Sequence, residues 1–238
     1  MIAARNIRDP IKFILPMEGA GILLVHESNY ISIFNHNLEI ESSTKIVPDT
    51  DIIGHVAADG SRFVISTETG KLIQCQFDEI SKFIEFNFIN NNIYNYRINS
   101  LKLVGFHIII GTASGELILI DFQTTDLIGF YQVNRKPVSG LFPLAVNSAN
   151  LQRILISFND RENLLFDVPT QQLVGVPKWL ENGRIEFCKL GQDEYSTPPE
   201  SGFDSGVISI NNRVYFFNSS PENVSIIRQI GEIDRMEL

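Results

Sequence analysis

The chain has 238 residues, of which 44% are hydrophobic and 20% charged, and its formal net charge is -9. This is an ordinary globular composition with ample material for a core. An acidic chain binds phosphate backbones poorly, so we expect contact with nucleic acid only indirectly or through partners. No stretch approaches the roughly 18 apolar residues of a membrane span, and no membrane contact is expected. Cys75 and Cys188 lie far apart and form no disulfide framework, which favours a reducing compartment.

An internal repeat organises the sequence. Residues 63–78 (FVISTETGKLIQCQFD) align with residues 108–123 (IIIGTASGELILIDFQ) at an offset of 45, which places Gly70 on Gly115. A third copy, residues 164–176 (LLFDVPTQQLVGV), aligns with residues 118–130 at an offset of 46, which places Asp121 on Asp167. Together with weaker copies, the predicted hairpins fall near residues 22–34, 63–77, 108–122, 154–167 and 207–217. A spacing of about 40 to 50 residues is typical of propeller blades.

Each copy has the pattern of a strand, a polar turn containing Gly or Asn, and a returning strand. In the segment 116–122, Leu117 and Leu119 alternate with Ile118, Ile120 and Phe122, so that both faces are apolar. Such strands are buried on both sides, as in the inner strands of a blade. We expect a third strand such as Leu127–Tyr131, followed after a loop by a fourth at Leu141–Val146.

The sequence therefore predicts an all-β β-propeller with WD40-like four-stranded blades, in about five repeats of about 45 residues. The blades are expected over residues 1–218, interrupted by an acidic loop rich in Pro, Gly and Ser at 193–206. Residues 219–238 are expected to be a C-terminal tail, either with a terminal strand at 224–227 or partly disordered. The chain is either a small propeller or part of a larger protein with several propellers.

Three segments carry a resemblance to a known superfamily. They are GAGILLVHESNYISIFN at 19–35 with Ile14-Leu15-Pro16 before it, DGSRFVISTETGKLIQCQF at 59–77, and IIIGTASGELILIDF at 108–122. In this order they resemble damaged-DNA-binding protein 1, an MMS1-type repair scaffold, the large subunit of the cleavage and polyadenylation specificity factor, and the large propeller subunit of splicing factor 3b. The resemblance covers about one propeller of much longer proteins. The tryptophan of WD40 blades is missing, because Ile120 and Phe166 stand before the repeated aspartates.

The resemblance implies a non-enzymatic scaffold of a nuclear complex, either a DNA-repair ubiquitin ligase or an assembly for pre-mRNA 3′ processing or splicing. Its partners would be other protein subunits, and no cofactor or small-molecule substrate is expected. Two alternatives remain: a generic cytoplasmic WD40-like adaptor, and a propeller enzyme or small-ligand-binding domain.

No motif in the sequence points to catalysis or metal binding. The four histidines and two cysteines lack paired ligand spacing, and no nucleophile elbow or phosphate-binding loop is present. We therefore expect no catalytic, metal or cofactor residues, and a buried, inert thiol at Cys75. Because Asp121 and Asp167 recur with the repeat, a hydrogen bond in a turn is the favoured role for them.

Three residues are weak candidates for partner contact. Phe83 begins the aromatic run FIEFNF at 83–88, for which we favour an outer strand that packs inward through Phe86 and Phe88. A partner-binding edge is the alternative. Arg135 and Lys136 lie in a loop that could contact a partner, although a solvated connection is favoured.

Overall fold

The computed structural model describes residues 9–17, 19, 21–89, 96–147, 150–176, 178–181, 183–190, 204–211, 213–219 and 224–232. In this part of the chain, the strands form five four-stranded antiparallel sheets, each made of four consecutive strands. The chain divides into two compact units, residues 1–113 with 117–131, and residues 114–116 with 132–238.

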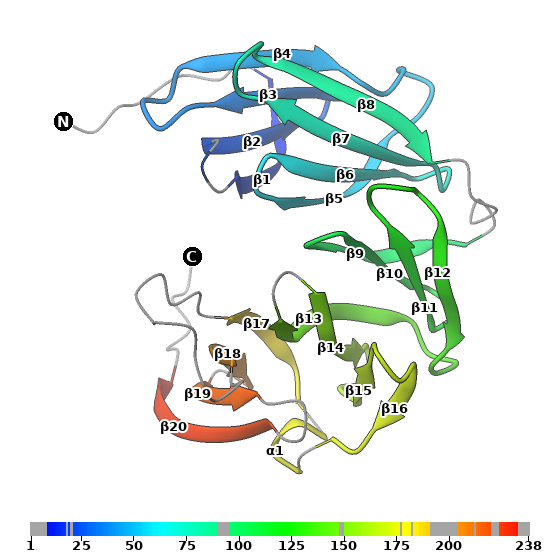
Figure 1. Ribbon diagram of the computed structural model, residues 1–238, viewed down its shortest axis with the longest axis vertical. Helices are drawn as coiled ribbons and strands as arrows, with labels where there is room; N and C mark the ends of the chain where they lie inside the picture. The colour runs from blue at the N-terminus through cyan, green and yellow to red at the C-terminus, as the bar shows by residue number, and fades with distance from the viewer. Residues whose placement is uncertain are drawn as a thin grey trace. The chain divides into compact units, whose positions relative to one another are not determined.

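The first unit holds three sheets, drawn from blue to green in Figure 1. The strands of the first sheet are β1 (Ile11–Met17), β2 (Gly21–His26), β3 (Tyr30–Phe34) and β4 (Ile40–Lys45). Those of the second are β5 (Ile53–Asp59), β6 (Arg62–Thr67), β7 (Leu72–Asp78) and β8 (Phe83–Ile89). Those of the third are β9 (Ile98–Val104), β10 (His107–Thr112), β11 (Glu116–Asp121) and β12 (Leu127–Gln132).

The second unit holds two sheets and a short helix. One sheet contains β13 (Val138–Asn147), β14 (Asn150–Phe158), β15 (Asn163–Asp167) and β16 (Gln172–Val174). After the helix α1 (Lys178–Glu181), the other sheet contains β17 (Ile185–Leu190), β18 (Asp204–Ile210), β19 (Arg213–Ser219) and β20 (Val224–Glu232). Within the part of the chain that the structure describes, no helix has the length and apolarity needed to cross a bilayer.

The middle strands are buried on both faces, as the sequence predicts. In β6, Phe63 and Ile65 belong to the core shared with the first sheet, whereas Val64 belongs to the core shared with the third. In β11, Leu117 and Ile118 are both fully buried although they point to opposite faces. Alternate side chains of one strand thus pack against two different neighbouring sheets, which ties the sheets of the first unit together.

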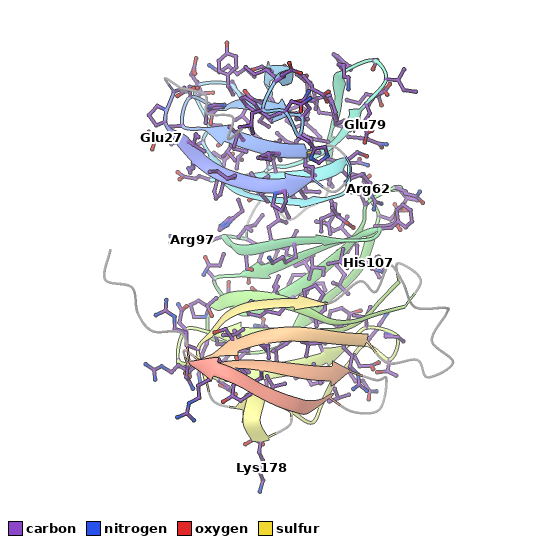
Figure 2. All side chains as sticks on the ribbon, turned by 90° about the vertical axis from the view of Figure 1, so that its left-hand side faces the viewer. Glu27, Arg62, Glu79, Arg97, His107 and Lys178 are labelled. Atoms are coloured by element: carbon purple, nitrogen blue, oxygen red, sulfur yellow. The ribbon has the colours of Figure 1, made fainter. Side chains whose placement is uncertain are left out.

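A polar seam joins the second and third sheets. The Arg62 guanidinium carbon lies 4.7 Å from the centroid of the Phe106 ring and 5.5 Å from that of Phe122, at the position labelled in Figure 2. Arg62 also pairs with Asp59 at 3.4 Å, and the other hydrogen bond of this carboxylate comes from the Gly105 amide at 2.6 Å. The cation–π contacts and the hydrogen bond from the Gly105 amide hold the β9–β10 turn and the end of β11 against the turn between β5 and β6.

Tight hairpins join the second and third strand of the sheets. Asn29, Gly70 and Gly115 occupy these turns with φ angles of 65°, 83° and 89°, in the left-handed region. A Cβ atom at Gly115 would lie 2.4 Å from the Asn134 carbonyl oxygen, so this turn requires glycine for space as well as for conformation. The second and third strands therefore meet at turns that Gly or Asn satisfies best.

The five predicted hairpins are the middle strands of the five sheets: β2–β3, β6–β7, β10–β11, β14–β15 and β18–β19. The prediction that Leu141–Val146 is the fourth strand of the third repeat is wrong. That segment lies in β13, the first strand of the next sheet, while β9 completes the third sheet. The sequence of β9, INSLKLV, alternates only weakly, because its polar residues interrupt the apolar pattern.

The C-terminal boundary also needs correction. The fifth sheet does not stop at residue 218, because β19 ends at Ser219 and β20 extends the sheet to Glu232 within the expected tail. Of the two alternatives for residues 219–238, the structure shows the terminal strand, because the expected strand at 224–227 is the beginning of β20, which pairs with β19. Of the expected loop 193–206, residues 193–203 lie outside the described residues, and residues 204–206 already belong to β18.

The repeated aspartates form hydrogen bonds within turns, as predicted. Asp121 Oδ1 accepts from the Gln123 and Thr124 amides at 2.8 Å each. Asp167 Oδ1 accepts from the Thr170 amide at 2.9 Å and from its hydroxyl at 2.6 Å. Burial disfavours the charged form of Asp167, but the Thr170 hydrogen bonds and the pair with Arg153 outweigh it and hold the pKa of Asp167 below its ordinary value.

The side chain of Asn29 should contribute to the stability of the first unit. Its amide nitrogen donates to the carbonyls of Pro48 at 3.3 Å and Asp51 at 2.7 Å, and its Oδ1 accepts from the Ile53 amide at 3.3 Å. We expect Asn29→Ala to lower the free energy of unfolding by about 2 kcal/mol, since buried backbone groups lose their partners. Urea unfolding measures this, with the exposed Asn37→Ala as control. Equal stability of the two variants would contradict the assignment.

Substituting Asp167 should have a pH-dependent effect. Because the pKa of Asp167 is lower in the folded chain than in the unfolded one, its carboxylate stabilises the fold above about pH 4. This stabilisation is lost as the pH falls through the folded pKa. We expect Asp167→Asn to cost about 1 kcal/mol at pH 7 and progressively less at acidic pH, measured by urea unfolding at several pH values. The exposed Asp126→Asn is the control, and a pH-independent cost at Asp167 would contradict the prediction.

Candidate functional site

A polar cavity of about 450 Å³ lies in the second unit. It is formed by the start of β13, the β14–β15 loop and the connection between α1 and β17. Its buried wall includes Ser157 and Ile185, whereas Ser139, Arg161 and Arg184 are exposed at its surface. The cavity therefore combines a rigid, buried side with two arginines that solvent reaches.

Arg161 has an unusual backbone conformation. Its φ angle is 73°, in the left-handed region that favours glycine and asparagine. The Arg161 amide donates to the Phe158 carbonyl, and the Phe158 amide donates to the Glu162 carbonyl, both at 3.0 Å. The same pair of hydrogen bonds surrounds Gly70 in the second sheet. An arginine therefore occupies, in the fourth sheet, the turn position that other sheets give to glycine or asparagine.

The two segments that carry the arginines are held together by hydrogen bonds. The Gly183 amide donates to the Arg161 carbonyl at 3.0 Å. The buried Asn163 side chain donates to the carbonyls of Leu180 at 2.6 Å and Gly183 at 3.1 Å. The Arg184 amide donates to Asn211 Oδ1 at 3.0 Å. These bonds fix the backbone beneath both arginines before any ligand binds.

The structure gives the predicted contact residues Arg135 and Lys136 different roles. Lys136 Nζ binds the carboxylates of both Asp160 and Glu162, and these hydrogen bonds raise the pKa of Lys136. Glu162 accepts a further hydrogen bond from Asn134 at 3.2 Å. Lys136 is thus already paired, and its positive charge offsets part of the negative charge of Asp160 and Glu162 next to Arg161. Arg135 is exposed, and its backbone amide donates to Asn134 Oδ1 at 2.7 Å.

Sequence reasoning missed Arg161 and Arg184. A signal for Arg161 was nonetheless present, because it follows Gly115 by 46 residues, as Gly115 follows Gly70 by 45. At position 161 an arginine stands where the preceding repeats have glycine, and this difference could have identified the residue. Arg184 gives no comparable signal, since hydrogen bonds between segments distant in sequence, such as that from Gly183 to Arg161, bring its segment to the cavity.

A second candidate surface lies on β8, the last strand of the second sheet. The prediction that this strand packs inward through Phe86 and Phe88 is wrong. Phe86 is 41% exposed and Phe88 57%, while Ile84 and Ile89 are the buried residues. The face that Ile84 shares with Phe86 and Phe88 is covered only at its beginning, where Ile84 joins the core.

Phe83, the third predicted contact residue, is 60% exposed on the same strand. The Phe86 and Phe88 rings form an edge-to-face pair with centroids 6.4 Å apart. Single exposed apolar residues are common, but three exposed phenylalanines within six residues of one edge strand are not. Phe86 and Phe88 lie on one face of β8 and Phe83 on the other, so both faces of this strand expose aromatic area. We call Phe83, Phe86 and Phe88 the β8 surface.

Among the described residues, no group of three or more His, Cys, Asp or Glu side chains is arranged to hold a metal ion. His26 Nε2 lies 3.0 Å from the Ser32 hydroxyl, and His55 Nε2 lies 3.1 Å from the Ile98 carbonyl oxygen. Burial lowers the pKa of His55 and of His107. Cys75 is buried, as predicted, and this burial raises the pKa of its thiol. The Cys188 side chain lies outside the described part.

No family model and no curated protein matches this sequence. Among solved structures, the chain is similar to the β-propeller domain of Cps50 (Swd1) from Myceliophteria thermophila. The TM-score is 0.54 at 11% sequence identity, over 92% of this chain and 73% of that chain. At this identity the likeness concerns the fold alone. Together with the five four-stranded antiparallel sheets, it confirms the predicted fold: the chain has the all-β fold of a β-propeller with WD40-like blades.

Proposed function

We propose that this chain is a protein-interaction scaffold that binds an extended segment of a partner protein along β8. The observation that carries this proposal is the β8 surface. An edge strand offers unpaired backbone groups to an added strand, and exposed aromatic side chains next to it offer pockets and contact area. Aromatic residues are also enriched among those that dominate binding energy at protein interfaces.

The charges around β8 define the chemistry of the partner. Asp78 at the end of β7, Glu79 in the turn that follows and Glu85 on β8 are all exposed, and Figure 2 labels Glu79. The nearby Lys82 is paired with Glu41 at 2.8 Å, so its charge is already neutralised. An acidic border around an aromatic surface favours a partner segment with apolar and basic side chains.

The superfamily resemblance supports a more specific proposal. The partner would be a subunit of a nuclear complex, either a ubiquitin ligase that acts in DNA repair or an assembly for pre-mRNA 3′ processing or splicing. The role would be non-enzymatic, because the rigid sheets would serve to position loops and edges for other subunits. A cytoplasmic WD40-like adaptor is the alternative, and localisation of the tagged protein distinguishes the two.

Removing the aromatic groups from β8 should abolish partner binding. We expect Phe83→Ser, Phe86→Ser and Phe88→Ser, combined in one chain, to reduce partner recovery at least tenfold, since buried aromatic anchors often contribute about 2 kcal/mol or more each. The measurement is quantitative mass spectrometry after affinity purification of tagged full-length chains. Leu127→Ser on the outer strand β12 is the matched control, because Leu127 is 51% exposed. Undiminished recovery with the triple variant would refute docking at β8.

The same purification identifies the complex. Recovery of a cullin with repair factors would support the ubiquitin-ligase proposal, while polyadenylation or splicing subunits would support the RNA-processing one. A photo-crosslinking residue in place of the exposed Asn87 should attach to a partner segment rich in apolar and basic residues. Crosslinks only to acidic segments would contradict the charge argument.

A further inference from the structure

We infer that the cavity in the second unit binds a phosphorylated serine or threonine side chain of a partner protein, through Arg161 and Arg184. This inference deepens the proposed function, because it names a second feature that a partner would present. It does not depend on the β8 surface, since that surface lies in the other unit.

The guanidinium groups of Arg161 and Arg184 are available to bind an anion. Both arginines line the cavity, and among the described residues neither has a carboxylate partner for its side chain. A guanidinium offers five donors in a planar fork that matches the oxygens of a phosphate group. A phosphorylated side chain carries a charge near -2 at neutral pH and three acceptor oxygens, so two arginines complement it in charge and in number of donors.

The backbone of Arg161 has a left-handed conformation. A left-handed conformation is unfavourable for a long side chain, and glycine would remove the strain. Asn29, Gly70 and Gly115 adopt this conformation in other hairpins of the chain with residues suited to it. Among the described residues, four others that are neither glycine nor asparagine also adopt this conformation: Leu38, Lys82, Thr125 and Gln171. The conformation of Arg161 therefore supports the inference only together with the position of its side chain at the cavity.

The charges near Arg161 and the volume of the cavity favour a small anion over a long polyanion. The acids beside Arg161 are Asp160 and Glu162, and Lys136 binds both of them. Of these charged groups, Arg161 and Arg184 line the cavity, whereas Lys136 lies outside its lining and offsets part of the charge of Asp160 and Glu162, in a chain whose net charge is -9. A long polyanion would be repelled by such a chain, whereas one compact dianion can be held by the two forks at short range. The volume of about 450 Å³ accommodates a side chain with part of its backbone.

Supporting groups make the cavity suited to a fixed ligand. Ser157 donates its hydroxyl hydrogen bond to Asn163, whose amide in turn holds the Gly183 carbonyl at 3.1 Å. Ser139 adds an exposed hydroxyl that can donate to a phosphate oxygen. The backbone segments that carry the hydrogen-bond donors are therefore fixed before the ligand binds.

The test titrates the full chain with N-acetyl-phosphoserine-N-methylamide and follows binding by isothermal calorimetry and by NMR shifts. We expect saturable binding at millimolar or lower concentration, and at least tenfold weaker binding in Arg161→Gly and in Arg184→Gln. Arg135→Gln is the matched control, because it removes an exposed arginine of the same unit that does not line the cavity, and it should weaken binding less than twofold. Absence of saturable binding, or an equal effect of all three substitutions, would overturn the inference.

Arg161→Gly also provides an internal check. If the strain argument holds, this variant loses binding yet raises the midpoint of thermal unfolding by about 2–4 °C. A variant that loses binding because it misfolds would instead show a lower midpoint. In that case Arg184→Gln decides, since its backbone hydrogen bond to Asn211 does not need the arginine side chain.

Two further probes separate the sources of the anion. Inorganic phosphate that binds as tightly as the capped phosphoserine would overturn recognition of a side chain, as would capped glutamate binding with the same affinity. The triple β8 variant should bind the capped phosphoserine as the unaltered chain does. Failure of docking at β8 and failure of this site can therefore be distinguished.

Discussion

Burial of the inner strands on both faces is the constraint on which the rest of the structure depends. In β6, Phe63 and Ile65 enter one core while Val64, between them, enters another. A slip of one residue in the pairing of such a strand would exchange the two sets of side chains. Two cores with differently shaped residues therefore hold each strand in a single register, and this register decides which residues fall in the turns.

The hairpins must then reverse the chain within a few residues without shifting that register. A residue with positive φ achieves this, and Gly70 and Gly115 meet the requirement with no side chain to accommodate. Arg161 meets it against its own preference. Local rules and the global fold agree at most positions of a natural protein, so a position where they conflict is informative about function. Here the conflict coincides with the edge of a cavity and with a second arginine.

Much of the fold could be predicted from the sequence because the repeat and the apolar pattern both report on the inner strands. Ile108 and Ile120, which pair across β10 and β11, are buried in one core, and the next pair, Ile109 and Leu119, is buried on the opposite face of the sheet. The outer strands are less constrained, since one of their edges and part of their surface meet solvent. Phe86 and Phe88 are of a residue type common in cores, yet both are exposed on the outer strand β8.

The candidate site was less predictable for a related reason. A cavity depends on contacts between segments distant in sequence, such as the hydrogen bond from Gly183 to Arg161. Composition pointed instead to Arg135 and Lys136, because adjacent basic residues are conspicuous in an acidic chain. Whether a cation is available, however, depends on its partners, and two carboxylates already occupy Lys136.

An acidic chain can still recognise an anion, because screening makes electrostatics local. At physiological ionic strength the Debye length is about 8 Å, so exposed charges farther away contribute little to the potential inside a cavity. The net charge of -9 then mainly disfavours extended polyanions, which would meet many carboxylates at once. Pairing Asp160 and Glu162 with Lys136, rather than with Arg161, leaves the guanidinium free for a ligand. The same acidity around β8 favours basic segments there, so the two surfaces select for different features of a partner.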